Sequence, residues 1–166
     1  MTIFNDKTHF GKPLRQVHFI DIDNLFGGPC TDFEMHLEMK EQYIKETSFS
    51  DEDLCFIACA HPAAFNVSLV WDSARVYWRS GKNGADKALI DALAMVDTKN
   101  FEHIWVASGD GCFIRKLKQI SGSERNCMLS MVASYKEDVN REYFNFMNDV
   151  RVLKSEIRPK SLEKVA

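Results

Sequence analysis

Five short apolar segments, separated by longer amphipathic ones, are the feature of this sequence that most constrains its fold. They are residues 17–22, 54–60, 74–78, 103–107 and 127–133. Each is apolar along most of its length instead of alternating between apolar and polar residues, which is typical of a strand buried on both faces of a parallel sheet. We therefore expect these five segments to be strands.

The segments that follow these strands have helical character. They are residues 32–46, 63–72, 86–96, 113–120 and 140–153. Thr31 and, three residues later, Glu34 form a capping-box pattern that predicts where the first helix begins. Strands and helices that alternate in this way predict an α/β fold with an open sheet and right-handed crossovers.

Length and composition indicate an ordinary globular chain. Its 166 residues suit one domain, which we expect over residues 1–154, followed by a polar tail over residues 155–166. Hydrophobic residues make up 45% and charged residues 27%, which excludes a disordered, collagen-like or coiled-coil chain. No run of about 18 apolar residues predicts a membrane span, and the first residues, MTIFNDKTHF, lack a secretory-signal pattern. We expect a cytoplasmic protein with no membrane partner.

Net charge and cysteine spacing narrow the possible functions further. A net charge of −3 argues against a surface that is basic all over, although it is compatible with local basic patches. The five cysteines form no Cys-x2-Cys pair with the spacing of a zinc site. We expect them to be reduced thiols with structural roles.

Three aspartates lie where predicted strands end or where a predicted helix begins. Asp21 ends the first strand, Asp110 follows the fourth strand, and Asp86 opens the helix after the third strand. In a parallel sheet the ends of the strands and the starts of the following helices share one edge, where ligands bind. We expect these three carboxylates to converge.

Converging carboxylates repel one another unless a cation lies between them. Mg²⁺ and Mn²⁺ prefer oxygen ligands, and such ions bridge phosphate oxygens and activate water. Each aspartate also has a simpler interpretation: a turn at Asp21 and Asp23, a helix cap at Asp86, and a tight turn at Asp110. Asp91 lies about 140° around the helix from Asp86 and cannot share its face, so it could pair with Lys87 or act as an accessory acid.

Basic residues accompany these acids in the sequence. Arg79, Lys82 and Lys87 surround Asp86, and Arg115 and Lys116 follow Asp110. Such residues could guide a phosphate backbone to a metal site, and Tyr77 or Trp78 could stack a base. The alternative is that Arg115 and Lys116 belong to a solvated helix face, and that Tyr77 or Trp78 faces the core.

Three blocks of sequence carry a resemblance to a known family. Residues 19–25 (FIDIDNL) read as an apolar strand that ends in Asp21, followed by Asn24; residues 84–93 read GADKALIDAL; residues 108–113 read SGDGCF. Together the blocks resemble the NYN domain, a branch of the PIN-like ribonucleases. The resemblance covers about residues 17–120.

The resemblance implies a three-layer α/β/α sandwich with a mostly parallel sheet of about five strands. It also implies a metal-dependent endoribonuclease that cleaves single-stranded RNA with Mg²⁺ or Mn²⁺. The residues that match the family's motifs have these implied roles: metal ligands at Asp21, Asp86 and Asp110; a ligand- or substrate-orienting amide at Asn24; accessory positions at Asp23, Asp91, Ser108 and Cys112.

Cys112 is the departure from the family pattern, because the family has an aspartate at this position. A thiol is a soft ligand and suits Mg²⁺ poorly, so the site could hold one metal, hold it weakly, or have lost catalysis. An alternative is therefore a catalytically weakened module that binds RNA or protein. Another is a haloacid-dehalogenase-like phosphatase in which Asp21 is the nucleophile and Asp23 the acid, although Asp86 has no role there.

Overall fold

A parallel β-sheet forms the centre of the computed structural model, which describes residues 8–9, 12–13, 15–79, 81, 83–122 and 127–153. The sheet has six strands in the order β5-β4-β3-β6-β7-β8, and every neighbouring pair is parallel. The strands are β3 (Gln16–Asp21), β4 (Leu54–Cys59), β5 (Arg75–Trp78), β6 (His103–Ala107), β7 (Met128–Ala133) and β8 (Asp149–Val152). All five expected strands are confirmed, and β8 is additional.

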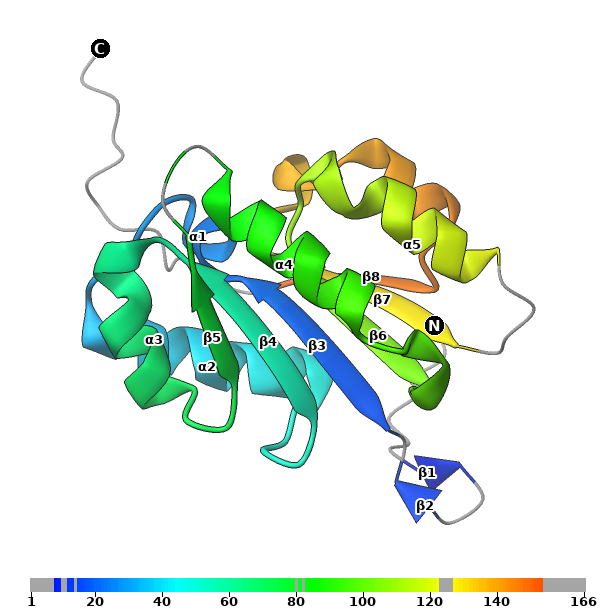
Figure 1. Cartoon of the computed structure of the whole chain (residues 1–166), viewed down its shortest axis with the longest axis horizontal. Coiled ribbons are helices and arrows are strands. Elements are labelled where there is room, and N and C mark those ends of the chain that lie inside the picture. Colours follow the sequence, from blue (N-terminus) through cyan, green and yellow to red (C-terminus); the bar gives the residue numbers. More distant parts are fainter. Residues whose placement is uncertain are drawn as a thin grey trace.

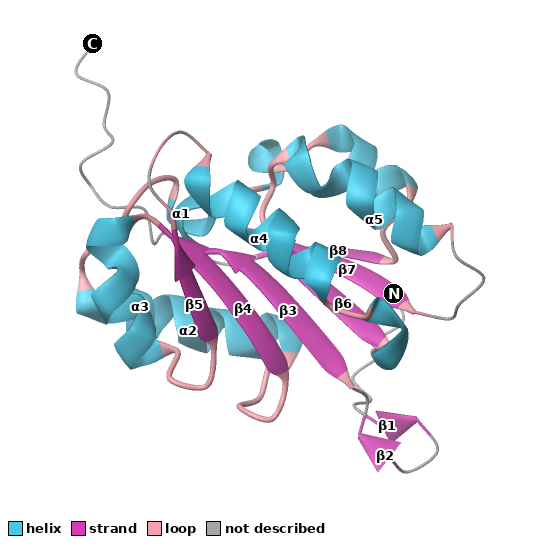
Figure 2. Ribbon diagram, viewed as in Figure 1, coloured by secondary structure: helices cyan, strands magenta, loops and turns pink. Residues whose placement is uncertain are grey.

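Helices cover both faces of this sheet (Figures 1 and 2). On one face lie α2 (Phe33–Thr47) and α3 (Ala64–Val70), and on the other lie α4 (Gly84–Met95) and α5 (Ile114–Ser121). The fold is therefore the expected three-layer α/β/α sandwich. The shorter elements are β1 (Thr8–His9), β2 (Lys12–Pro13), α1 (Ile22–Phe26), η1 (His61–Ala63), η2 (Thr98–Asn100), η3 (Gly111–Phe113), η4 (Lys136–Asp138) and η5 (Arg141–Asn145). No helix in the described part of the chain is long and apolar enough to cross a bilayer.

Two hydrophobic cores, one on each face of the sheet, explain why the strands are apolar along their length. Phe19 of β3 packs into the core beneath α4 and α5, whereas its neighbour Ile20 packs into the core beneath α2 and α3. Both side chains are at most 1% exposed. Burial of a side chain of this size contributes about 1.5–3 kcal/mol to stability, so β3 is held from both sides.

The prediction of a helix over residues 140–153 is wrong, because the structure has the short 3₁₀ helix η5 and the strand β8 there. Asn140 instead caps η5 by accepting from the Glu142 N–H, and the chain then extends into β8. Within β8 charged and apolar residues alternate, and the strand is half-buried at the edge of the sheet. This two-residue period is typical of a half-buried strand, but the aromatic residues that precede it have helical spacing and indicate a helix in the sequence alone.

The N-terminal cap of α2 also differs from the expectation. Asp32, not Thr31, caps the helix, because its Oδ1 accepts from the Met35 N–H at 3.1 Å.

The order of the strands determines where a ligand can bind. The chain leaves β3 toward β4 on one side and reaches β6 on the other, so the order reverses between β3 and β6. Ligands of open α/β sheets bind beyond the carboxyl ends of the strands at such a switch point.

Candidate metal centre

An open cleft of about 820 Å³ lies beyond the carboxyl ends of β3, β4 and β6. It is strongly acidic: the six described carboxylates that line it are Asp21, Asp23, Asp86, Asp110, Glu137 and Asp138. Among the described residues that line the cleft, Arg79 is the one with a cationic side chain. The structure thus brings the three expected metal ligands into one cleft at the switch point of the sheet.

Asp21 occupies the base of this cleft. It is the last residue of β3, it is 4% exposed, and its Oδ1 accepts from the Asn24 N–H at 3.1 Å. Burial, followed by a hydrogen bond and charge repulsion from Asp86, raises the pKa of Asp21 to about 8. The Asp21 carboxyl therefore favours its protonated form at neutral pH unless a cation lies against it.

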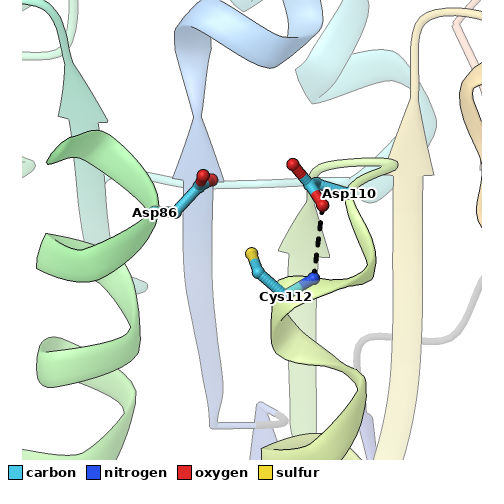
Figure 3. A group of neighbouring side chains, drawn as sticks. All are labelled: Asp86, Asp110 and Cys112. Atoms are coloured by element: carbon cyan, nitrogen blue, oxygen red, sulfur yellow. Dashed lines mark hydrogen bonds between the residues drawn. The ribbon is translucent and has the colours of Figure 1, made fainter. Parts of the chain in front are cut away.

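Asp86, Asp110 and Cys112 lie close together and form a group of possible metal ligands (Figure 3). Each offers one ligand atom, and the three atoms lie within 4.8 Å of one another. Asp86 points from the first turn of α4 toward the other two, which come from the loop after β6 and from η3. Three donors at this separation can hold a single small cation together.

The Cys112 thiol belongs to this cluster, although the residue is exposed. Burial first, and then the charges of Asp86 and Asp110, raise the pKa of Cys112 well above its usual range. Without a cation the group is therefore a neutral thiol. A bound divalent cation would reverse this preference, because a coordinating thiol is deprotonated.

Asn24 holds the loop that carries Asp110. Its Oδ1 accepts from the Gly109 N–H at 2.9 Å, and so it joins the end of β3 to the end of β6. On the other side of the loop, the Gly109 carbonyl accepts from the Asn140 N–H at 3.0 Å. The Tyr143 hydroxyl donates to the Asp110 carbonyl. Through the first of these contacts, Asn24 positions the loop that carries Asp110.

Asp23 lies on the β4 side of the cleft. Its Oδ2 accepts from the Ala60 N–H at 2.6 Å. Its Oδ1 is buried and has no hydrogen-bond partner among the residues that the structure describes. Burial raises the pKa of this carboxyl. A buried carboxylate oxygen without a donor is costly, and a cation or its bound water would satisfy it.

Asp91 does not line the cleft. It forms an ion pair with Arg79, with Nη2 and Oδ2 3.0 Å apart. A pair with Lys87 was one of the two possibilities that the sequence left open. Both side chains are about half exposed, so the pair contributes little to stability. Its effect is to orient Arg79, which does line the cleft.

The other basic residues of the expected path, as far as the structure describes them, do not line the cleft. Lys87 is exposed on α4, and Arg115 and Lys116 lie on α5 without lining the cleft. Lys82 lies outside the described residues. Ser108 is fully buried, and its Oγ accepts from the Asp110 N–H at 3.3 Å, so it supports the loop instead of facing a ligand. Of the expected basic residues that the structure describes, Arg79 is therefore the one that lines the cleft.

Two acidic residues of the cleft, Glu137 and Asp138, were missed in the sequence. They follow the carboxyl end of β7, just as Asp23 follows that of β3 and Asp110 follows that of β6. The same rule, that residues after a parallel strand meet at one edge, could have found them.

The chain matches no protein-family model and no curated protein sequence.

Proposed function

We propose that this protein is a divalent-metal-dependent endoribonuclease that hydrolyses phosphodiester bonds of single-stranded RNA. The observation that carries the proposal is the cluster of Asp86, Asp110 and Cys112, whose ligand atoms lie within 4.8 Å of one another. Asp21 adds a fourth donor in hydrogen-bonding contact with Asp86. The resemblance of the same residues to the NYN motifs supports the RNA substrate.

The residues of the cleft fit a hard divalent cation such as Mg²⁺ or Mn²⁺. Carboxylate oxygens are the donors that these ions prefer, and the buried Asp23 Oδ1 lacks a partner among the described residues. Asp21, Asp86 and Asp110 would hold the cation directly or through water. When bound, such an ion lowers the pKa of a coordinated water and neutralises charge on a phosphate.

The protein supplies the positions of these groups. Asp21 is fixed by its buried place at the end of β3, and Asn24 fixes the Asp110 loop relative to it. Arg79, which Asp91 orients, is placed to bind a phosphate oxygen and to offset part of the repulsion between RNA and the acidic lining. The wide opening of the cleft admits a polymer strand.

Cys112 adjusts which cation the site prefers. A thiolate is a soft ligand, so it disfavours Mg²⁺ and is better suited to Mn²⁺ and to softer divalent ions. We therefore propose Mn²⁺ as the more effective of the two cofactors. The proposal includes a cytoplasmic location, which the five free cysteines favour, because thiols persist in reducing compartments.

A cleavage assay on unstructured RNA tests the proposal. We expect the wild-type protein to cleave internally with Mn²⁺ and to stop when a chelator is added. Asp110→Asn should slow cleavage at least about 100-fold, since metal stabilisation of developing charge contributes several kcal/mol. Asp72→Asn is the matched control, because Asp72 is exposed and follows α3 at the opposite edge of the sheet.

The main alternative is a module that binds RNA without cleaving it. The replacement of a carboxylate by the neutral Cys112 thiol favours this alternative. It requires RNA binding that survives chelation, weakens steeply with salt and is accompanied by no cleavage with Mn²⁺. Such a result would contradict the proposed nuclease activity.

A further inference from the structure

Trp78 and His61 form an exposed pair of aromatic side chains, called here the Trp78–His61 pair. Their ring centroids are 4.8 Å apart and their planes are inclined at 74°. Trp78 is 55% exposed, whereas Trp71 and Trp105 are at most 2% exposed. The indole of Trp78 is thus the one tryptophan ring of the chain with a large surface open to solvent.

The pair lies at the rim of the acidic cleft. Trp78 ends β5 and is paired in the sheet with Cys59, at the end of β4. The residue after Trp78 is Arg79, and the residue before His61 is Ala60. Both of these neighbours line the cleft, and adjacent Cα atoms are about 3.8 Å apart. Trp78 and His61 do not themselves line the cleft, but each directly adjoins a residue that does, on the β4–β5 side.

The alternation of side chains along β5 explains why Trp78 remains exposed. Val76 packs into the core beneath α2 and α3, and Tyr77 packs on the opposite face. Tyr77 is half-buried against Phe56, with ring centroids 6.2 Å apart. Trp78 points to the same face as Val76 but contacts His61 at the end of the sheet. Of the two aromatic residues, only Trp78 is therefore available to a ligand.

The position of the pair is fixed through the site. Asp23 Oδ2 accepts from the Ala60 N–H at 2.6 Å, which anchors the turn that begins η1 with His61. Arg79, next to Trp78, is held by Asp91 at 3.0 Å. Among the described residues, the cleft thus has acids at its centre and Arg79 beside them, and the Trp78–His61 pair adjoins the cleft residues Arg79 and Ala60 in the chain.

We infer that the Trp78–His61 pair stacks an unpaired base of the RNA strand whose phosphate occupies the acidic cleft. The inference rests on the proposed function, because it assumes a nucleic-acid ligand. Base–aromatic stacking tolerates any sequence, since every base has a π-face. In a duplex these faces are covered by neighbouring bases. The pair therefore selects single strands without selecting a sequence, and Arg79 contacts the phosphate between the stacked base and the metal site.

Intrinsic tryptophan fluorescence reports on this contact directly. The probe is an eight-nucleotide oligouridylate in buffer with Ca²⁺ in place of Mn²⁺, so that an oxygen-liganded cation offsets the acidic lining while cleavage is suppressed. Because Trp71 and Trp105 are buried, a stacked base should quench mainly the Trp78 emission. We expect saturable quenching by the oligonucleotide and none by an RNA duplex with blunt ends. The absence of quenching at saturation, with binding measured independently, would overturn the inference.

The affinity of variants for the same oligonucleotide, labelled for fluorescence anisotropy, gives a second readout. We expect Trp78→Ala to weaken binding about 5- to 100-fold, since loss of one stacked base costs ~1–3 kcal/mol. Trp78→Phe should restore most of the affinity. Met95→Ala is the control, because Met95 is exposed at the far end of α4. Equal affinity of wild type and Trp78→Ala would overturn the inference.

These results separate the inference from the proposed nuclease activity. Quenching without cleavage in Mn²⁺ would uphold the stacking contact and contradict the catalytic proposal. Cleavage by the wild-type protein, together with an unchanged oligonucleotide affinity and unchanged quenching in Trp78→Ala, would uphold the catalytic proposal and contradict the stacking contact. Failure of the wild-type protein to bind the oligonucleotide would overturn the inference and the RNA substrate together.

Discussion

Asn24 Oδ1 accepts a 2.9 Å hydrogen bond from the Gly109 N–H, and this contact joins the two strands between which the sheet reverses its order. Asn24 follows Asp21 in α1, and Gly109 precedes Asp110. The hydrogen bond therefore sets the position of one candidate metal ligand relative to another, although 85 residues separate the two partners in the chain.

Replacement of Asn24 by alanine should weaken metal binding without removing a carboxylate. The Gly109 N–H loses its acceptor, which costs about 1–3 kcal/mol of unfolding free energy, and the Asp110 loop is released. We expect Mn²⁺ affinity to fall about 10- to 100-fold, as for other residues that orient metal ligands. Urea unfolding and calorimetric titration measure the two effects. Asn24→Asp retains an acceptor oxygen and should restore most of the stability; unchanged Mn²⁺ affinity in Asn24→Ala would contradict the positioning role.

Gly109 is required for its lack of a side chain. A Cβ at this position would lie 2.2 Å from the Asp138 carbonyl oxygen, so the backbone would have to move. We expect Gly109→Ala to lower the midpoint of urea unfolding and to weaken Mn²⁺ binding, because the displaced segment carries Asp110. Gly122→Ala is the control, since a Cβ there would have its nearest described neighbour at 3.4 Å. A Gly109→Ala protein with wild-type unfolding and metal affinity would refute this account.

Cys112 should determine the metal preference of the site. Cys112→Asp adds a hard oxygen ligand within the cluster, so we expect its affinity for Mg²⁺ to rise about tenfold or more. Calorimetric titration with Mg²⁺ measures this change. Cys127→Asp is the control, because Cys127 precedes β7 at the opposite edge of the sheet.

A spectroscopic readout tests the same position without reference to activity. Co²⁺ bound to the wild-type protein should show near-ultraviolet charge-transfer absorption from a thiolate ligand, and Cys112→Ser should lose it. Retention of this absorption in Cys112→Ser, or an unchanged Mg²⁺ affinity in Cys112→Asp, would show that the thiol does not face the metal.

His103 should make the stability of the fold depend on pH. Burial, reinforced by the charge of Arg151, lowers the pKa of His103 from 6.5 to about 4. Between these values the unfolded chain binds more protons than the folded protein, so the free energy of unfolding rises as the pH rises from about 4 to 6.5. We expect His103→Gln, which keeps a polar partner for Ser130, to reduce this rise by up to about 2 kcal/mol.

Urea unfolding at pH values below and above this window measures the effect of His103. His36 also has a lowered pKa, and the raised pKa of Asp21 acts in the opposite direction. Both groups are present in the two proteins, so the difference between wild type and His103→Gln isolates His103. An identical pH dependence in the two proteins would contradict the assignment.

Much of the fold could be predicted from the sequence because burial on both faces leaves a simple pattern. Strands such as β6, with the sequence HIWVA, have no solvent-facing residues, and their continuous apolar character identified them. The convergence of Asp21, Asp86 and Asp110 followed from the same pattern, since parallel strands direct their carboxyl ends to one edge. Function could be predicted only as a hypothesis, through the chemistry of those acids and a family resemblance.

The remaining features depend on contacts that a single sequence does not encode locally. The edge strand β8 is half-buried, so its signal is weaker than that of the central strands. In the sequence, either Arg79 or Lys87 could be the ion-pair partner of Asp91. The path of the chain after β5 brings Arg79 to Asp91, and the sequence alone does not show this path. The role of Asn24 depends on a backbone N–H far along the chain, for which no spacing rule exists.

The central claim is that the carboxylates of Asp21, Asp86 and Asp110 bind Mn²⁺. Calorimetric titration of the metal-free protein with Mn²⁺ at neutral pH tests this claim most directly. We expect saturable binding by the wild-type protein, a loss of affinity of at least about tenfold in Asp86→Asn and in Asp110→Asn, and no change in Asp72→Asn. Wild-type affinity in both cleft variants, with the folded state intact, would contradict the account.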